Sequence, residues 1–334
     1  MDLNEQQNKR VYSDSVTRWS RDEVLTNKWG DRYLEYRKRW NGEVAKEGDI
    51  GDFPMEYNLQ LVHGCNLACA ICHSSKWTNK RIDAEILKSV MEEAKEHHLC
   101  SCSFGMDSES FMDTELLFQA IDMASDAGVM DILIGTNGLL LTEETAKRVI
   151  SSGVVSLIKI SIDAYTAETY QTIRRSNQFD RVVDNVIRMV ELRDQMSASL
   201  PQIRVSFCKT YANKEEEKDF INKWERIVDQ VDIQNYSNLV GVFQDVGQGK
   251  KIESDTCKDP FRRVAILADG TVQCCCNNYE EIQPEIILGN VREHSVYELW
   301  HSDKMKKIQK MFLNKDQAAY PEYCKKCLNS FYDF

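Results

Sequence analysis

HGCNLACAICHSS, residues 63–75, places Cys65, Cys69 and Cys72 in a C-x3-C-x2-C spacing. Three thiolates on one loop can bind three irons of a cubane iron–sulfur cluster, because Cys thiolate is the usual ligand of such clusters. The fourth iron then stays open for a substrate, as the free position of a catalytic metal site does. A zinc site is the alternative, because either of two nearby histidines can supply its fourth ligand: His63 or His73. The spacing predicts a metal centre on this loop.

The loop follows a strand and precedes a regular alternation of helices and strands. Residues 55–61 alternate apolar and polar side chains, as a strand with one buried face does. Five more strands are expected at 99–104, 131–136, 156–163, 203–210 and 231–236, and helices between them at 83–97, 114–127, 142–151, 166–175, 180–196 and 214–229. Strands that alternate with helices predict a parallel sheet with helices outside. Six strands fall short of the eight in a closed barrel, so the predicted fold class is α/β, with a partial (β/α)6 TIM-like barrel.

Two of the expected strands carry polar side chains on the face that would line the barrel. These are Lys159, Ser161 and Asp163 on the fourth strand, and Arg204, Ser206 and Cys208 on the fifth. A strand that is buried on both faces is normally apolar on both. The alternation therefore predicts an interior filled with water or ligand. Lys159 and Arg204 are candidate substrate contacts, and the alternative for each is a salt bridge to an inner carboxylate such as Asp163.

A second group of cysteines lies in the last quarter of the chain. Cys324 and Cys327 form a C-x2-C pair, and Cys257 and Cys275 can complete a set of four thiolates. VAILADGTVQ, residues 264–273, reads as a β-hairpin that brings the first two of these cysteines together. Four thiolates suit either a zinc knuckle or a closed iron–sulfur cluster. The spacing alone does not choose between them.

Composition and charge narrow the class of protein. The chain has 334 residues, 12 cysteines and a net charge of −11, and the charge argues against non-specific binding to nucleic acid or to anionic membrane. The N-terminal residues lack the apolar core of a secretory signal, and no apolar run is long enough to span a bilayer. Disulfide frameworks are typical of small secreted domains. We therefore expect a cytoplasmic protein whose cysteines bind metal.

On these motifs, residues 55–236 resemble the radical S-adenosylmethionine (SAM) superfamily. Besides the three cysteines, the resemblance rests on Gly105–Glu109, a loosened form of the family's GGEP stretch, on the TNG sequence at 136–138 and on the S-x-D sequence at 161–163. The resemblance implies that Cys65, Cys69 and Cys72 hold a [4Fe–4S] cluster whose open iron binds SAM. It also implies a set of SAM-binding residues: Glu109, Thr136, Asn137, Ser161, Asp163 and Arg174.

The tail resembles the twitch form of the SPASM domain, which binds one auxiliary [4Fe–4S] cluster. The implied ligands are Cys257, Cys275, Cys324 and Cys327; Cys275 is preferred to Cys274 and Cys276 because it lies five residues after Gly270. The expected organisation is then a helical N-terminal extension at 1–54, the barrel at 55–240, and a small cysteine-rich twitch/SPASM-like domain with a β-hairpin at 241–334.

The implied activity is reductive cleavage of SAM to a 5′-deoxyadenosyl radical, which takes hydrogen from a polar small molecule. A sugar or aminocyclitol is expected, with dehydrogenation, dehydration or epimerisation as the outcome, by an oxidoreductase or an isomerase of carbohydrate biosynthesis. A flavodoxin- or ferredoxin-type donor would supply the electron. Cys208 is a candidate hydrogen donor to the substrate radical, and a buried structural cysteine is the alternative. The other hypotheses are maturation of a ribosomal peptide or protein side chain, and a non-catalytic metal-binding scaffold.

Overall fold

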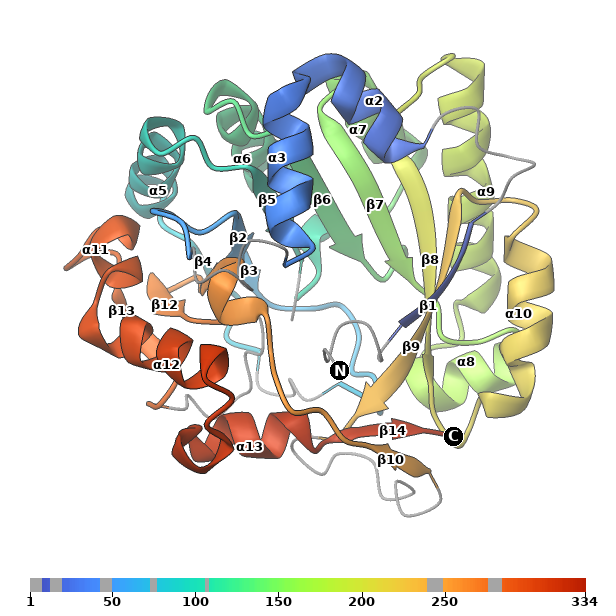
Figure 1. Ribbon diagram of the computed structural model, residues 1–334. Coiled ribbons are helices and arrows are strands. Elements are labelled where there is room, and N and C mark those ends of the chain that lie inside the picture. The colour runs from blue at the N-terminus through green and yellow to red at the C-terminus, as the bar shows by residue number, and fades with distance from the viewer. Residues whose placement is uncertain are drawn as a thin grey trace.

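Six parallel strands form the centre of the sheet in the computed structural model (Figure 1). The structure describes residues 8–12, 20–42, 50–72, 77–105, 108–238, 249–275 and 284–334. The central strands, in the order in which they pair, are β2 (Glu56–Leu59), β5 (Ser101–Phe104), β6 (Asp131–Thr136), β7 (Val155–Ser161), β8 (Gln202–Lys209) and β9 (Gln230–Ser237). Because β2 and β9 pair with other strands and not with each other, the barrel is open. The predicted α/β fold with a partial (β/α)6 barrel is confirmed.

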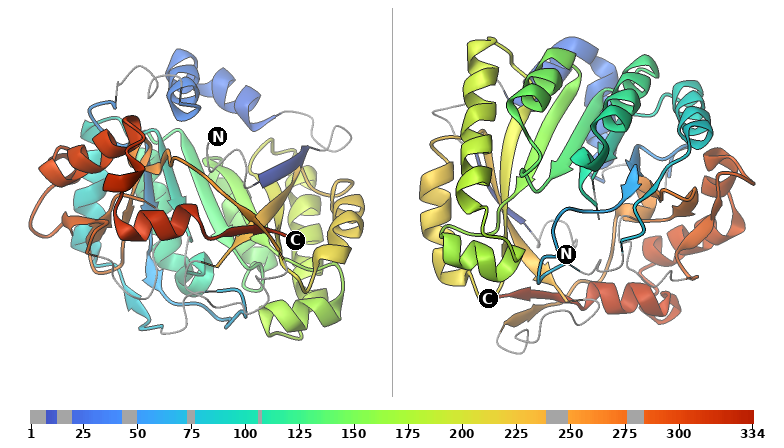
Figure 2. Two further views of the ribbon diagram at one scale, coloured as in Figure 1. Left: turned by 60° about the horizontal axis from the view of Figure 1, so that its bottom comes forward. Right: turned by 180° about the vertical axis from the view of Figure 1, so that it is seen from behind.

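Helices cover the outer face of these strands (Figures 1 and 2). They are α5 (Ala84–Glu96), α6 (Thr114–Asp126), α7 (Glu143–Ser152), α8 (Ala167–Arg174), α9 (Phe179–Gln195) and α10 (Glu217–Trp224), with short 3-10 turns η1 (Ser110–Asp113) and η2 (Lys214–Glu216). Local signals set their ends: the Thr142 hydroxyl accepts from the backbone N–H of Thr145 at 3.2 Å, and Gly153 ends α7 with φ of 63°.

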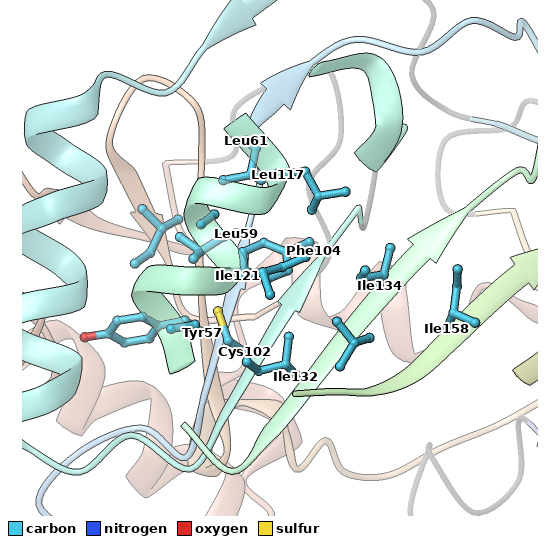
Figure 3. Packing of buried hydrophobic residues seen from close by; sticks show 14 of the residues in the cluster. Tyr57, Leu59, Leu61, Cys102, Phe104, Leu117, Ile121, Ile132, Ile134 and Ile158 are labelled. Atoms are coloured by element: carbon cyan, nitrogen blue, oxygen red, sulfur yellow. The ribbon is translucent and has the colours of Figure 1, made fainter. Parts of the chain in front are cut away.

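The main core lies between the sheet and these helices. The outward side chains of the strands are apolar and buried, as Figure 3 shows for Tyr57, Leu59, Cys102, Phe104 and Ile132. They pack against helix residues such as Leu117 and Ile121 of α6. The apolar side chains of each strand thus pack against the helices, and the polar side chains of the alternate positions face the barrel interior.

The C-terminal part of the chain is attached to both edges of the open barrel. It contains β10 (Lys250–Ile252), η4 (Asp259–Phe261), β11 (Arg263–Ile266), β12 (Thr271–Gln273), β13 (Ile287–Asn290), α11 (Val296–Trp300), α12 (Asp303–Leu313), η5 (Gln317–Ala319), α13 (Glu322–Leu328) and β14 (Phe331–Asp333). The predicted hairpin is β11 and β12, which pair antiparallel. β11 also pairs in parallel with β2, and β14 pairs antiparallel with β9.

The N-terminal extension differs from the helical expectation. It contains α2 (Arg21–Trp29) and α3 (Asp31–Trp40), but Asn8–Tyr12 form a strand, β1, that pairs antiparallel with residues 230–234 of β9. An edge strand offers unpaired backbone groups, and β1 satisfies those of β9 next to the place where β14 pairs.

Helices α2 and α3 cover the amino ends of the barrel strands (Figure 1). There the Tyr36 hydroxyl donates to the Asp131 carboxylate at 3.2 Å, and Arg21 lies 3.7 Å from the same carboxylate. No helix in the described part of the chain is long and apolar enough to cross a membrane. The division of the chain at residues 54 and 240 stays a prediction.

Candidate metal centres

The first cysteine group lies in a loop held at both ends. Two short antiparallel strands enclose it, β3 (Val62–His63) and β4 (Lys80–Arg81), which the sequence did not predict. Within the loop, the backbone N–H of Ala70 donates to the carbonyl of Ile173 at 2.7 Å, which ties the cysteines to the end of α8. The loop therefore lies at the carboxyl end of the barrel strands, where βα-barrel enzymes carry their active sites.

The three thiols of this loop are half-buried and close enough to influence one another electrostatically. Burial raises the pKa of Cys65 to about 11, the Leu67 N–H that donates to its Sγ at 3.4 Å lowers it, and Cys69 and Cys72 add to the rise. Bound iron replaces the thiol proton, so these groups act as ligands in the thiolate form. A soft three-thiolate set is suited to an iron–sulfur cluster.

Three of the predicted SAM-binding residues meet beside the Cys65 loop. The Glu109 carboxylate accepts from the Thr136 hydroxyl and from the Asn137 N–H, both at 2.7 Å. Burial raises the pKa of Glu109, and these hydrogen bonds lower it by less than burial raises it. The Asn137 amide in turn donates to Asn66 Oδ1 at 2.7 Å and to Cys65 Sγ at 3.7 Å. The Glu109 side chain is thus turned toward the end of β6, while its backbone N–H donates to the Gly64 carbonyl at 2.9 Å. The Asn137 side chain is the one of these three that bonds Cys65.

Of the other three predicted residues, Arg174 is the one with a hydrogen bond to a cysteine of the loop. Arg174 pairs with Asp163 at 2.5 Å and donates to Cys69 Sγ at 3.6 Å. Asp163 has a left-handed backbone, with φ of 62°, and its Oδ1 accepts the Cys208 N–H at 2.7 Å. Ser161 accepts from the Ser206 hydroxyl at 3.3 Å on the inner face. The structure therefore brings Cys69, Arg174, Asp163 and the backbone of Cys208 into one chain of contacts.

Two buried polar atoms next to the loop lack a hydrogen-bond partner, the Tyr170 hydroxyl and Arg174 Nε. A buried donor that is left unpaired costs free energy, so such atoms call for a bound group. Among the described residues, no group of three or more His, Cys, Asp or Glu side chains is placed to hold a metal ion. The cysteine ligands of an iron–sulfur cluster each bind a different iron, so their sulfur atoms do not converge on a single ion. The donor set and the two unpaired atoms fit a cluster with a bound ligand.

The predicted substrate contacts are engaged with other inner residues. Lys159 Nζ lies 4.0 Å from Asp232, and burial lowers the pKa of Lys159 while Asp232 raises it. Arg204 Nε donates to Gln230 Oε1 at 2.8 Å. The salt-bridge alternative thus describes Lys159, although its partner is Asp232 and not Asp163. Asp232 was not predicted as a site residue, although the alternation of the sixth strand places it on the inner face.

The four cysteines of the second group come from three places in the C-terminal part. Cys257 precedes η4, Cys275 follows β12, and Cys324 and Cys327 lie three residues apart on α13 and so on one face. Burial raises the pKa of Cys257, and Cys327 and Cys275 add to the rise. Burial likewise raises the pKa of Cys324, with Cys275 and Cys327 adding.

Cys274, which precedes Cys275, has a different environment. Cys274 is buried in the apolar core, with 1% of its surface exposed, whereas Cys275 is half-buried beside the other cysteines of the group. Cys276 lies outside the described residues.

Comparison with known proteins gives a family match over each of the two cysteine groups. The profile of the Radical SAM superfamily matches residues 59–197, and the profile of the iron–sulfur cluster-binding domain SPASM matches residues 257–328. Mycofactocin maturase MftC of Mycobacterium tuberculosis is 29% identical over 136 residues, which are 40% of this chain and 33% of MftC. The chain spans between a third and about half of the length of the curated relatives that it matches.

Two crystal structures share the fold over most of the chain. BtrN in complex with AdoMet and 2-DOIA has a TM-score of 0.58 at 17% identity, covering 83% of this chain and 94% of BtrN. Streptococcus suis SuiB bound to the precursor peptide SuiA has a TM-score of 0.56 at 14% identity, covering 82% of this chain and 70% of SuiB. Together the two matched profiles span more than half of the sequence. The chain belongs to the radical SAM superfamily and carries a SPASM domain, and its cofactors are SAM and two iron–sulfur clusters.

Proposed function

We propose that this enzyme takes a hydrogen atom from a polar small molecule, a sugar or an aminocyclitol, held inside the open barrel. SAM supplies the 5′-deoxyadenosyl radical when its sulfonium is cleaved by one electron, for which we propose a flavodoxin- or ferredoxin-type donor. Cys65, Cys69 and Cys72 would hold the SAM-binding [4Fe–4S] cluster, and Cys257, Cys275, Cys324 and Cys327 the auxiliary one. Glu109, Thr136, Asn137, Ser161, Asp163 and Arg174 would position SAM between the Cys65 loop and the barrel wall.

The observation that carries this proposal is the polar inner face of the sheet. On β7 to β9 it presents the Lys159–Asp232 pair, and the Lys159 side chain is still 31% exposed. An ammonium and a carboxylate at 4.0 Å can exchange their mutual contact for hydrogen bonds to ligand hydroxyl and amine groups. A wall of this kind suits a substrate rich in hydroxyl groups better than an apolar one.

The polar face continues into the C-terminal domain. Asn58 of β2, Ala265 of β11 and Gln273 of β12 are register partners across three neighbouring strands, so their side chains share the inner face. Gln60 lies on the same face two residues beyond Asn58. Gln60 Nε2 and Gln273 Oε1 are both buried and lack a hydrogen-bond partner. One donor and one acceptor are thus left for a polar ligand that reaches this part of the wall.

Cys208 supports epimerisation as one outcome. Its side chain lies half-buried on the inner face of β8, and burial raises the pKa of its thiol, with Asp163 adding to the rise. The sulfur therefore keeps its proton at neutral pH, and a protonated thiol is the form that returns a hydrogen atom to a substrate radical. In oxidation the auxiliary cluster would accept the electron instead, and Cys208 would have no chemical part.

The substrate class is tested by measuring SAM-dependent formation of 5′-deoxyadenosine with reductant present. A panel of amino sugars and aminocyclitols is compared with precursor-type peptides of equal concentration. The proposal predicts stimulation by the polyhydroxylated amines and loss of that stimulation in Asp232→Asn. Stimulation by peptides alone would refute it.

The outcome is tested by running the reaction in deuterated water with Cys208→Ala. Solvent deuterium in the product, lost in this variant and kept in the control Cys102→Ala, supports epimerisation. Cys102 is the matched control because its side chain points to the helices and not into the barrel (Figure 3). Full turnover in Cys208→Ala excludes epimerisation through this thiol.

Maturation of a ribosomal peptide or protein side chain is the second candidate. It is favoured by the similarity to mycofactocin maturase MftC, which is 29% identical to this chain over 136 residues. The same panel separates the two candidates, because a maturase responds to its peptide and not to free amino sugars.

A further inference from the structure

Helix α8 presents two polar side chains, Tyr170 and Arg174, toward the Cys65 loop. They are four residues apart and so lie on one face of the helix. The end of α8 is fastened to the loop by the hydrogen bond from the Ala70 N–H to the Ile173 carbonyl. Arg174 reaches Cys69 Sγ at 3.6 Å. The face of α8 that carries Tyr170 is thus the face that meets the cysteines.

Tyr170 is held with its hydroxyl unpaired. The residue is fully buried, its ring packs on Phe179 with centroids 5.5 Å apart, and its hydroxyl has no hydrogen-bond partner. Burial raises the pKa of Tyr170 to about 12; Arg174 lowers it, and Cys69, Asp163 and Cys65 raise it further. The phenol is therefore a protonated donor within the electrostatic reach of two cysteines of the loop. The proposed function gives it no role, and no motif in the sequence indicates one.

We propose that Tyr170 donates a hydrogen bond to the sulfur shell of the SAM-binding cluster and thereby makes that cluster easier to reduce. Hydrogen bonds to cluster sulfurs raise the reduction potential, because they stabilise the added negative charge. Arg174 acts in the same direction through Cys69, and its pairing with Asp163 holds the guanidinium in place. The inference rests on the proposed assignment of Cys65, Cys69 and Cys72 as ligands. In this scheme Tyr170 contacts the cluster and does not touch the substrate.

The chain offers a matched control for the loss of one hydroxyl. Tyr57 is also fully buried with its hydroxyl unpaired, but it lies between the sheet and α5, where the groups near it include Cys102 and the Glu93 carboxylate of α5 (Figure 3). Tyr170→Phe and Tyr57→Phe therefore remove the same group from equally buried sites, and only one of those sites faces the Cys65 loop.

The test is a redox titration of both reconstituted variants and of the wild type, followed by electron paramagnetic resonance. The SAM-binding cluster is identified as the one whose signal changes when SAM is added. We expect Tyr170→Phe to be about tenfold harder to reduce, which for one electron is a potential ~59 mV lower. Tyr57→Phe keeps the wild-type value. An unchanged potential in Tyr170→Phe, or an equal shift in both variants, overturns the inference.

A second measurement covers the case in which Tyr170→Phe binds less iron. The proposed hydrogen bond carries an exchangeable proton. The reduced wild-type cluster should therefore show a coupled proton signal that disappears in deuterated water and that is missing from the clusters retained by Tyr170→Phe. The signals from the other donors, Leu67, Asn137 and Arg174, should remain in both proteins. The same set of exchangeable proton signals in the wild type and in Tyr170→Phe overturns the inference. A wild type that binds no SAM-responsive cluster at all refutes the proposed function instead, so the two failures are distinct.

Discussion

At the scale of single residues, Asn137 is the side chain that joins the end of β6 to the Cys65 loop. Its side-chain amide donates hydrogen bonds to Asn66 Oδ1 and Cys65 Sγ, and its backbone N–H donates to the Glu109 carboxylate. We expect Asn137→Ala to release cluster iron to a chelator ~10-fold faster, since outer partners of metal ligands have effects of this size. The measurement is the rate of iron release from the anaerobically reconstituted protein.

The control for this prediction is Asn185→Ala. The Asn185 amide donates to the Gly138 carbonyl at 2.8 Å, in the same turn, but does not bond the cysteine loop. Equal rates of iron release in Asn137→Ala and the wild type would remove Asn137 from the site.

Glu56 makes the stability of the fold depend on pH. It lies on the inner face of β2, accepts from Ser101 at 3.3 Å and lies 3.5 Å from Arg263. Burial raises its pKa in the folded state, while Arg263 lowers it. A carboxyl whose folded pKa is raised stabilises the fold below its unfolded value, near 4.5, and this contribution is lost as pH rises through the folded pKa.

We therefore expect Glu56→Gln to flatten the fall in unfolding free energy as pH rises above about 4.5. Urea denaturation at several pH values measures this slope. The exposed Glu115, paired with Arg148, has a lowered pKa and serves as the control, Glu115→Gln. A slope that is the same in Glu56→Gln and the wild type would contradict the prediction.

At the scale of elements, β14 shows how a short strand closes an edge of the sheet. Phe331 pairs with Ser237 of β9 and is buried, whereas Tyr332 pairs with Tyr236 and points to the other face, half-buried. We expect Phe331→Ala to lower the free energy of unfolding by about 3 kcal/mol, the cost of removing a buried aromatic ring. Tyr332→Ala should cost clearly less, and chemical denaturation of both variants checks this. Equal losses would mean that β14 does not dock through Phe331.

The elements that the sequence predicted are those long enough to show a period. The six barrel strands alternate over four or more residues, and the hairpin of β11 and β12 has a turn signal between its strands. By contrast, β3, β4, β10 and β14 have two or three residues each, too few for a pattern. β1 was missed because its strand conformation comes from pairing with the edge of β9, and local sequence does not encode that partner.

The same contrast applies to the candidate sites. Cysteine spacing and strand alternation indicated both cysteine groups and the polar inner face. They did not indicate Tyr170 or Gln273, because the role proposed for each residue rests on a buried polar atom that has no hydrogen-bond partner in the folded chain. Such atoms are visible only when every neighbour has been placed.

At the scale of the whole molecule, the C-terminal domain and the barrel share one sheet. β11 extends the sheet beyond β2, and β14 extends it beyond β9. One cysteine group lies in the barrel and the other in the C-terminal domain. The two cysteine groups are therefore attached to neighbouring strands of one sheet: the Cys65 loop follows β2, and Cys257 and Cys275 lie on either side of the β11–β12 hairpin. This arrangement is the basis for proposing radical formation at the first cluster and electron transfer to or from the second.

The most direct test of this account is the iron and sulfide content after anaerobic reconstitution, for the wild type and for the Cys65/Cys69/Cys72→Ala variant. Two cysteine-ligated cubane clusters predict about eight irons per chain in the wild type and about four in the variant, with sulfide falling in parallel. Bound zinc in place of iron, or a variant that loses no iron, would contradict the account.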